Sequence, residues 1–469
     1  MGIQGKKFFE KFVIHRYMII LEGYIGVNPS SNPKAEYREI ATKKIAYELE
    51  NEEFRCRSKD GRKGVFTRDR KLNFNNLILL IILFKSSIQR ELDSFFKKIS
   101  KEDFNIREVT KGAFTQARSK LNPWAFQRLN EIAVDSFYEG AHYYEWNGMR
   151  TLAVDGTRLV LPNHPSVVEE FGQHEFGPAA NSPRSLAMGS MLYDVFNQIT
   201  IDAQLAPYAS SERDLLMQHL GKVKEGDLLL LDRGYPSFWL FFLLKARKIE
   251  FCIRLKENWW LSAREFARSE DKERLVCFTL PKKDREKLAD CPHMEDQTVT
   301  CRLVKVELES GAKEILCTSL VDSEKYSYEE IIELYRYRWN EEEAYKLLKC
   351  RIELENFSGK TARAVKQDFF AKVFLMTLCA SFAHPIEEKV TNEYKADQNR
   401  KFDQKINRTN ALSMTRDILI GLFIRKQHEK ALQAFDNIVA QTREIIRPGR
   451  KEPRRKSAKK LYSMNYKRL

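Results

Sequence analysis

The sequence predicts a mixed α/β protein in which a central sheet is flanked by helices. Between residues 146 and 256, short apolar runs typical of strands alternate with segments of helical pattern. Residues 1–145 are rich in Lys and Arg and have mostly helical patterns, whereas 257–326 contains β-rich runs such as TVTCRLVKVEL. Helical patterns then return at 328–350 and 361–386.

Apolar runs bounded by turn residues fix the expected elements of the sheet region. We expect helices at 211–221 and 236–247, and strands at 151–161, 186–196, 198–206, 227–231 and 250–255. In the N-terminal region, residues 71–99 have the pattern of one long amphipathic helix, and 110–121 that of a shorter one. The pair resembles a helix-turn-helix, whose second helix would carry Arg118 and Lys120 to DNA. The alternative is a three-helix bundle with a solvated basic face.

Composition points to an acidic partner. The 469 residues carry a formal net charge of +15, which favours nucleic acid, with an anionic membrane surface as the alternative. No run reaches 18 apolar residues, and the N-terminus lacks the pattern of a signal peptide. The eight cysteines never form C-x2-C, so we expect reduced thiols rather than a zinc site.

Three stretches place a carboxylate where a metal ion could use it. Asp155 follows the apolar run TLAV, and Asp232 follows four leucines; each precedes a glycine turn. A single Asp in such a place is more often a turn former or a helix cap. Together with Glu342 downstream, they make the open, oxygen-only ligand set that Mg²⁺ or Mn²⁺ prefers.

Glu342 belongs to a polar stripe. Gaps of 3, 4 and 7 residues place four side chains on one face of a helix: Tyr335, Arg338, Glu342 and Lys349. This combination is too polar for a core face and suits a phosphodiester beside a cation. The alternative is a solvated helix face.

The motifs VDGT, LLLLDRGYP and Y-x2-R-x3-E-x6-K together resemble those of the DDE transposases of bacterial insertion sequences. The resemblance is to the branch with the Tyr-Arg-Glu-Lys signature, the IS-four family, and it runs from about residue 65 to the C-terminus. It implies a ribonuclease-H-like catalytic core, with the first two aspartates on neighbouring strands and a β-rich insertion before the glutamate.

The resemblance also implies a chemistry. Asp155, Asp232 and Glu342 would hold two Mg²⁺ (or Mn²⁺) ions and catalyse cleavage at the element's ends and transfer to target DNA. Cut-and-paste transposition is expected. Tyr335 would contact a phosphate or base, Arg338 would clamp a phosphate, and Lys349 would add a point charge.

The expected partners are double-stranded DNA, as terminal inverted repeats and target, and a second copy of the chain in the synaptic complex. No membrane is expected, and the protein would be bacterial, cytoplasmic and associated with the nucleoid. The expected domains are a helical, basic DNA-binding domain (1–145), the catalytic core (146–256 and 327–386), the β-rich insertion (257–326), a helical C-terminal region (387–446) and a basic tail (447–469).

Two other functions are compatible with these residues. One is a metal-dependent nuclease on the same fold that cleaves DNA without strand transfer. The other is a DNA-binding protein descended from a transposase that has lost its chemistry, although an intact Asp–Asp–Glu set argues against it.

Overall fold

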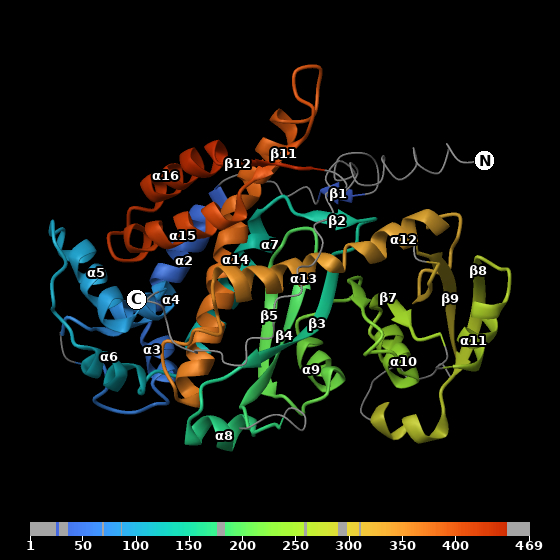
Figure 1. Cartoon of the computed structure of the whole chain (residues 1–469), viewed down its shortest axis with the longest axis horizontal. Helices are drawn as coiled ribbons and strands as arrows, with labels where there is room; N and C mark the ends of the chain where they lie inside the picture. Colours follow the sequence, from blue (N-terminus) through green and yellow to red (C-terminus); the bar gives the residue numbers. More distant parts are fainter. Residues whose placement is uncertain are drawn as a thin grey trace.

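A computed structural model describes residues 25–27, 36–67, 70–85, 87–175, 183–257, 260–288, 298–308 and 311–447 (Figure 1). The mixed α/β class is confirmed. The strands of the central sheet lie in the order β5-β4-β3-β6-β7-β10-β9-β8. Their bounds are β3 Thr151–Val160, β4 Leu186–Asp194, β5 Thr200–Pro207, β6 Leu228–Leu231, β7 Glu250–Leu255, β8 Glu273–Thr279, β9 Thr298–Glu307 and β10 Lys313–Thr318.

The first five strands match the expected ones closely. β3, β4 and β5 pair antiparallel, whereas β6 and β7 run parallel to β3. The β-rich character of the segment 257–326 is also observed. Its strands continue the same sheet, because β10 pairs antiparallel with β7, with Ile315 opposite Leu255.

Both faces of the sheet are buried. Side chains alternate along β6, so Leu228 and Leu230 belong to one core cluster and Leu229 and Leu231 to the other. Helix α14 (Ala362–Glu393) covers the first face, and α10 (Phe238–Ala246) covers the second (Figure 1). Burial on two faces explains why this strand is a run of leucines without polar alternation.

Helices and short segments surround this sheet. The N-terminal region contains α2 Glu36–Glu50, α3 Glu52–Ser58, α4 Phe74–Leu83, α5 Ile88–Ser100, α6 Lys111–Arg118 and α7 Trp124–Gly140. The middle of the chain adds α8 Pro165–Phe171, α9 Glu212–His219, α11 Leu261–Arg268 and the 3₁₀ turns η2 Lys282–Asp284 and η3 Glu286–Leu288. The short strands pair as β1 Ile25–Val27 with β2 Tyr144–Trp146, and as β11 Gln404–Ile406 with β12 Arg443–Ile445.

The C-terminal helices lie against the N-terminal ones. α15 (Arg408–Phe423) and α16 (His428–Gln441) both contact α2 (Figure 1). Buried Arg38 forms a bidentate pair with Asp436, with donor–acceptor distances of 2.6 and 2.9 Å. The two ends of the described chain therefore form one helical layer beside the sheet. Of the basic tail 447–469, all but Arg447 lies outside the described residues.

The prediction of one long helix over 71–99 is wrong. The segment forms α4 and α5, with a break after Phe84. The ammonium of Lys372, buried on α14, donates to the carbonyls of Ile82 at 2.6 Å and Phe84 at 2.8 Å. These carbonyls at the end of α4 are satisfied by a side chain instead of another helical turn.

Helix α14 is long and apolar enough to cross a membrane by length and composition, which the sequence analysis did not anticipate. Its most apolar window has a mean hydropathy of 1.5 and is 94% buried inside the structure. It is a central helix of the core.

The structure contradicts the expectation that Arg118 reads DNA bases. Arg118 is 3% exposed, and its side chain points into the protein from the end of α6. It donates to Gln367 at 2.9 Å, to Ser358 at 2.7 Å and to Asp368 at 3.0 Å. These bonds hold α6 against α14. They use all three nitrogens of the guanidinium, which leaves none to donate to a DNA base. Lys120, by contrast, is exposed just beyond α6.

We expect Arg118→Ala to lower the free energy of unfolding by about 3–5 kcal/mol, because removal of one member of a buried pair leaves the Asp368 charge uncompensated. Lys120→Ala, the matched loss of a cation from an exposed site nearby, should change stability by less than about 0.5 kcal/mol. Urea denaturation of both variants measures the difference. Equal, small effects would show that Arg118 does not anchor α6.

Candidate active site

The strand pairing brings Asp155 and Asp232 to neighbouring positions. β3 and β6 run parallel with Val154 opposite Leu231, so each aspartate is the next residue along its strand. β6 ends at Leu231, whereas β3 continues to Val160 along β4. Asp155 therefore lies at the point where β3 loses its neighbour β6, and its carboxylate is only partly buried.

Arg338 joins the predicted site residues. Its guanidinium is 3% exposed. Nη1 lies 3.7 Å from Asp155 Oδ2, and Nη2 donates to Glu342 Oε1 at 3.3 Å. Burial opposes its charge, but Tyr335 and the carboxylates of Asp232, Asp155 and Glu342 outweigh burial and raise the pKa of Arg338. The three predicted acidic residues thus converge on one buried cation.

The predicted helix 328–350 is divided. α12 (Tyr328–Arg336) begins with a capping box and ends two residues before Arg338, α13 spans Trp339–Lys346, and the π-helix η4 follows at Leu347–Arg351. Tyr337 and Arg338, between α12 and α13, keep right-handed helical backbone angles, but their amides bond to the third residue before them and not to the fourth. Arg338 lies at the start of α13, four residues before Glu342.

The outer members of the signature bind main-chain groups of the two aspartate-bearing strands. Tyr335 is 5% exposed, and its hydroxyl donates to the carbonyl of Leu231 at 3.3 Å. Lys349 donates to the carbonyl of Arg158 at 2.6 Å. For Tyr335 this geometry differs from the expected contact with a phosphate or base, because the ring is buried and the hydroxyl is used.

The sequence analysis missed Glu341 and Tyr345. Glu341 is fully buried, and its Oε1 accepts from the backbone amide of Asp155 at 2.9 Å. The hydroxyl of Tyr345 donates to the carbonyl of Asp155 at 2.7 Å. Both main-chain groups of Asp155 are therefore held by α13. The available signal was their spacing of four residues, which places both side chains on one face of a helix.

Glu212, at the start of α9, is a further carboxylate that the sequence analysis missed. Burial and then Asp232 raise its pKa. A Cβ atom at Gly234 would lie 2.5 Å from Glu212 Oε2, and one at Gly156 would lie 3.1 Å from Oε1. The glycines that follow the two aspartates therefore leave the space that this carboxylate occupies. The motif SERDLL contained the residue but gave no indication of its neighbours.

Acidic charge in this site is not fully compensated. Burial raises the pKa of Asp155 to about 6, and Glu212 and Asp232 add to the rise, while the amide of Gly156 and Arg338 oppose it. Burial also raises the pKa of Glu341 well above its usual value, with Asp155 adding to the effect. Asp232 Oδ1 is buried and has no hydrogen-bond partner among the residues that the structure describes.

These features suit a hard divalent cation chemically. The side chains offer carboxylate oxygens, two of which, Asp232 Oδ1 and Glu341 Oε2, are buried without a hydrogen-bond partner in the described part of the chain, in a region where added positive charge would be favourable. Within the described part of the chain, however, no group of three or more His, Cys, Asp or Glu side chains is close enough to hold a metal ion. The guanidinium of Arg338 lies between Asp155 and Glu342 instead.

Comparisons with known proteins indicate the family of this chain. The family model described as "Transposase DDE domain" matches residues 146–378. Transposase InsG for insertion sequence element IS4, from Escherichia coli (strain K12), is 24% identical over 279 residues, which cover 58% of this chain and 60% of InsG. The chain belongs to the DDE transposases of the IS4 family. The resemblance found in the sequence is thereby confirmed.

Two further similarities are more partial. InsZ of Escherichia coli (strain K12), also named as a transposase, is 25% identical over 146 residues, covering 30% of this chain and 47% of InsZ. The matches to InsG and InsZ thus span less than two thirds of either relative. A cryo-EM structure of the piggyBac transposase synaptic complex with hairpin DNA aligns with a TM-score of 0.43 and 12% identity, over 88% of this chain and 87% of that chain. That likeness is too distant to support a conclusion.

The raised pKa of Asp155 predicts that ionisation of this carboxyl lowers the free energy of unfolding of the metal-free protein. The carboxyl ionises near pH 3.8 in the unfolded chain and near pH 6 in the folded one. The loss of stability is therefore absent below pH 3.8, grows between pH 3.8 and 6, and is complete above pH 6. At about 1.4 kcal/mol per pKa unit, it amounts to roughly 3 kcal/mol. In EDTA at pH 8, Asp155→Asn should therefore be more stable than wild type, and this advantage should shrink toward pH 4.

Thermal denaturation between pH 4.5 and 8 measures this. Asp214→Asn is the matched control, since Asp214 is exposed on the same helix as Glu212. A stability difference for Asp155→Asn that stays constant with pH would rule out ionisation as its cause.

Proposed function

We propose that this protein cleaves the ends of an insertion sequence and joins them to target DNA by metal-dependent phosphodiester transfer, in a cut-and-paste reaction. The convergence of Asp155, Asp232 and Glu342 on Arg338 carries the proposal. The antiparallel order β5-β4-β3 followed by parallel β6 and β7 supports a ribonuclease-H-like core.

The electrostatics of the site support a need for metal ions. Five carboxyl groups, those of Asp155, Glu212, Asp232, Glu341 and Glu342, lie in this region, while Arg338 and, beside Glu212, Arg213 are the cations that act on them, so a DNA phosphate would meet an excess of acidic groups. Two Mg²⁺ or Mn²⁺ ions held by Asp155, Asp232 and Glu342 would supply activation of the attacking oxygen and stabilisation of the leaving 3′ oxygen.

The side chains around Asp155 keep its carboxylate in position. Glu341 and Tyr345 bind its amide and carbonyl, and Gly156 donates its backbone amide to Asp155 Oδ1 at 2.8 Å. The strand backbone that carries the carboxylate is therefore fixed before DNA binds. Such preorganisation lowers the cost of reaching the reactive geometry.

Arg338 is placed to change partners on DNA binding. With the carboxylates engaged by cations, its guanidinium could donate two parallel hydrogen bonds to the non-bridging oxygens of a phosphodiester. Tyr335 and Lys349 act mainly as positioning residues in this proposal, because they bind the strand carbonyls of Leu231 and Arg158. Lys120, exposed beyond α6, remains a proposed DNA contact.

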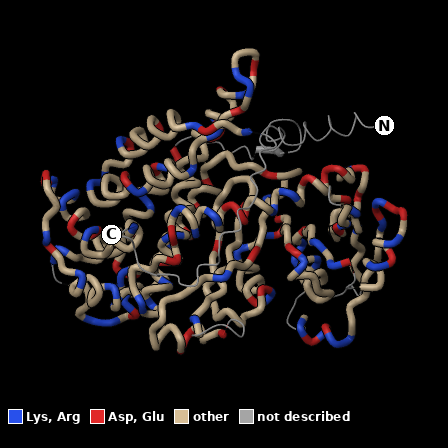
Figure 2. The backbone as a smooth tube through the Cα atoms, in the orientation of Figure 1, with Lys and Arg blue, Asp and Glu red and all other residues tan. Residues whose placement is uncertain are grey.

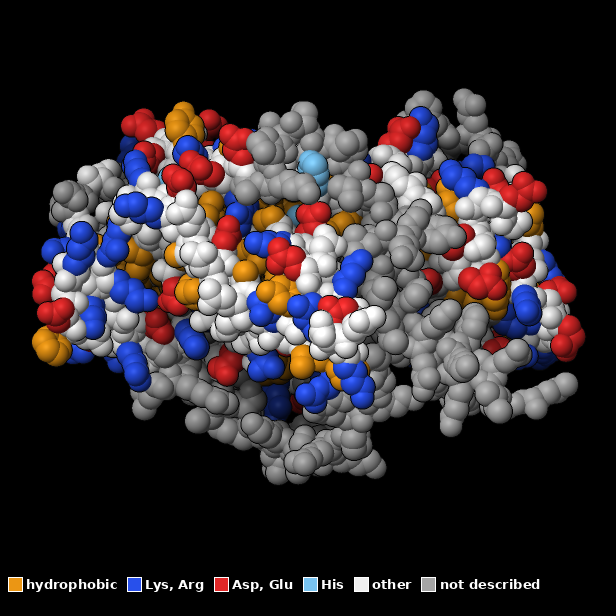
Figure 3. Space-filling model, turned by 90° about the horizontal axis from the view of Figure 1, so that it is seen from above, with side chains coloured by type: hydrophobic (Ala, Val, Ile, Leu, Met, Phe, Trp, Pro, Cys, Tyr) orange, Lys and Arg blue, Asp and Glu red, His pale blue; other side chains and the backbone are white. Residues whose placement is uncertain are grey.

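The proposed substrates are the terminal inverted repeats of the element and target DNA, and we propose that two copies of the chain pair the two ends. The net charge of +15 supports binding to a polyanion. Figure 2 shows basic positions along the N-terminal helices as well as near the sheet, and Figure 3 shows Lys and Arg side chains spread over one face of the helical layer.

We expect Asp155→Asn, Asp232→Asn and Glu342→Gln each to abolish Mg²⁺-dependent cleavage of a labelled duplex carrying the element's end, while binding to that duplex persists. Each change keeps the side-chain volume and removes a charge needed to hold the cations. Gel analysis of cleaved and joined products measures both steps. Cleavage without any joined product in the wild type would favour a nuclease over a transposase.

Glu341→Gln provides a sharper comparison, because Gln at 341 can keep the hydrogen bond from the Asp155 amide. If Glu342 is the third ligand, Glu341→Gln should retain cleavage and Glu342→Gln should lose it. The opposite result would assign the third carboxylate to Glu341.

Arg338→Ala should slow cleavage more than tenfold. A charge-assisted contact to phosphate contributes roughly 1.5–3 kcal/mol, and about 1.4 kcal/mol is a factor of ten in rate. Arg338→Lys should recover only part of the rate, because an ammonium cannot form two parallel bonds. Single-turnover rates at saturating Mg²⁺, with exposed Arg336→Ala as control, test this. A wild-type rate for Arg338→Ala would remove Arg338 from the reaction.

A further inference from the structure

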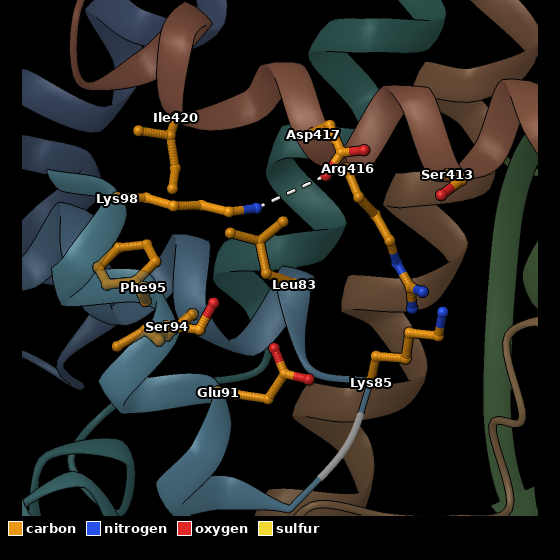
Figure 4. Close-up of a pocket in the computed structure, with 11 residues that line it drawn as sticks. Leu83, Lys85, Glu91, Ser94, Phe95, Lys98, Ser413, Arg416, Asp417 and Ile420 are labelled. Carbon is orange, nitrogen blue, oxygen red and sulfur yellow. Dashed lines mark ion pairs between the residues drawn. The ribbon is translucent and has the colours of Figure 1, made fainter. Parts of the chain in front are cut away.

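A cavity of about 180 Å³ lies between the N-terminal and C-terminal helices, away from the carboxylates of the sheet (Figure 4). α4 and α5 form one wall, with Lys85 in the connection between them, and α15 forms the other. None of its lining residues belongs to the proposed active site. The cavity thus needs a separate explanation.

Arg416, on α15, is the unusual residue of this cavity. Its Nε and Nη2 atoms are buried and have no hydrogen-bond partner in the described part of the chain. Burial lowers the pKa of its guanidinium, with Glu91 and Asp417 opposing that effect. Buried donors without hydrogen-bond acceptors are unfavourable, so these two atoms of the half-buried Arg416 indicate a missing acceptor.

A second cation faces the same space. In Figure 4 the charged ends of Arg416 and Lys85 point toward each other, and both residues line the cavity. Two cations directed at one space repel each other unless an anion lies between them.

The remaining charges do not cancel this excess. Lys98 pairs with Asp417, with Nζ 3.6 Å from Oδ1. Among the described residues that line the cavity, three cations, those of Lys85, Lys98 and Arg416, face the two carboxylates of Glu91 and Asp417. The hydroxyl groups of Ser94 and Ser413 also line the cavity and can donate hydrogen bonds.

We propose that this cavity binds a phosphate group. The guanidinium of Arg416 approaches from α15 and the ammonium of Lys85 from the connection before α5, which suits an anion bound between the two cations. The phosphate could belong to the DNA backbone or to a free phosphate compound, since the recognising chemistry is the same. The inference does not depend on the proposed catalysis, because phosphate binding can be measured without cleavage.

Occupancy would have a structural effect. Phosphate held by Lys85 and Arg416 would link the α4–α5 connection to α15, two segments far apart in the sequence. If the phosphate belongs to DNA, backbone binding there would fix the N-terminal helices against the C-terminal ones.

The first test uses inorganic phosphate with the full chain at constant ionic strength, with chloride as the reference anion. Wild type should show a saturable rise in melting temperature, and Arg416→Gln and Lys85→Gln should lose it. Lys430→Gln is the matched control, because Lys430 is exposed on α16 and does not line the cavity. Without phosphate, Arg416→Gln should be at least as stable as wild type, since it removes a buried charge lacking acceptors.

The second test measures duplex affinity across a salt series. One lost phosphate contact reduces the slope of log Kobs against log[salt] by about 0.9. That change in Arg416→Gln and Lys85→Gln, but not in Lys430→Gln, would assign the phosphate to DNA. Loss of inorganic phosphate binding with an unchanged slope would assign it to a free phosphate compound.

The proposal fails if the variants bind inorganic phosphate like wild type and keep its salt slope. It also fails if Arg416→Gln is markedly less stable than wild type without phosphate, because Arg416 would then be satisfied within the protein. Lys85 is exposed, so Lys85→Gln should leave folding intact and tests phosphate binding independently of the change at Arg416.

Discussion

Repulsion among acidic side chains where β3 passes the end of β6 is the constraint around which the centre of this structure is built. Parallel pairing makes Asp155 and Asp232 neighbours, and α9 and α13 add Glu212, Glu341 and Glu342. Neighbouring carboxylates repel one another unless a cation lies between them or one of them is protonated. Arg338 supplies one cation, and the raised pKa values of Asp155 and Glu341 favour protonation.

The helical segment that carries Arg338 and Glu342 is irregular just before them. α12 ends at Arg336 and α13 begins at Trp339, while Arg338 and Glu342 stay four residues apart and ion-paired, as one continuous helix would also place them. α13 then places Glu341 and Tyr345 on the main chain of Asp155, while Tyr335 and Lys349 reach β6 and β3. The signature residues thus fasten this helical segment to the strands that carry the aspartates.

Much of the fold could be predicted because its strands have simple patterns. Apolar runs before Asp155 and Asp232 reveal strands buried on both faces; Asp232 does follow the end of β6, but Asp155 and Gly156 lie within β3, which continues to Val160. Periodicity could not reveal the break at Arg338, because an ideal helical repeat contains no information about a turn imposed by neighbouring strands. Periodicity also could not show which of the adjacent residues Glu341 and Glu342 binds the Asp155 backbone and which pairs with Arg338.

Arg118 shows the other limit of local reasoning. In a sequence, an arginine among Gln116, Ser119 and Lys120 looks like part of a solvated basic face. Its partner Asp368 is 250 residues away, and only the packing of α6 on α14 brings them together. α14 also caps the end of α4 through Lys372 and contacts β5 through Thr377. Several cations and polar groups are therefore used to assemble the fold.

The distribution of charge explains how a protein with a net charge of +15 can have an acidic centre. Some cations are used internally, as at Arg118, Arg338 and Lys372, and others lie on the surface. Surface cations attract the DNA backbone without regard to sequence. The acidic centre opposes the approach of phosphate until cations occupy it. In the proposed function, the basic surface would hold DNA before metal ions reach the carboxylates, so DNA binding and cleavage would be separate steps in this molecule.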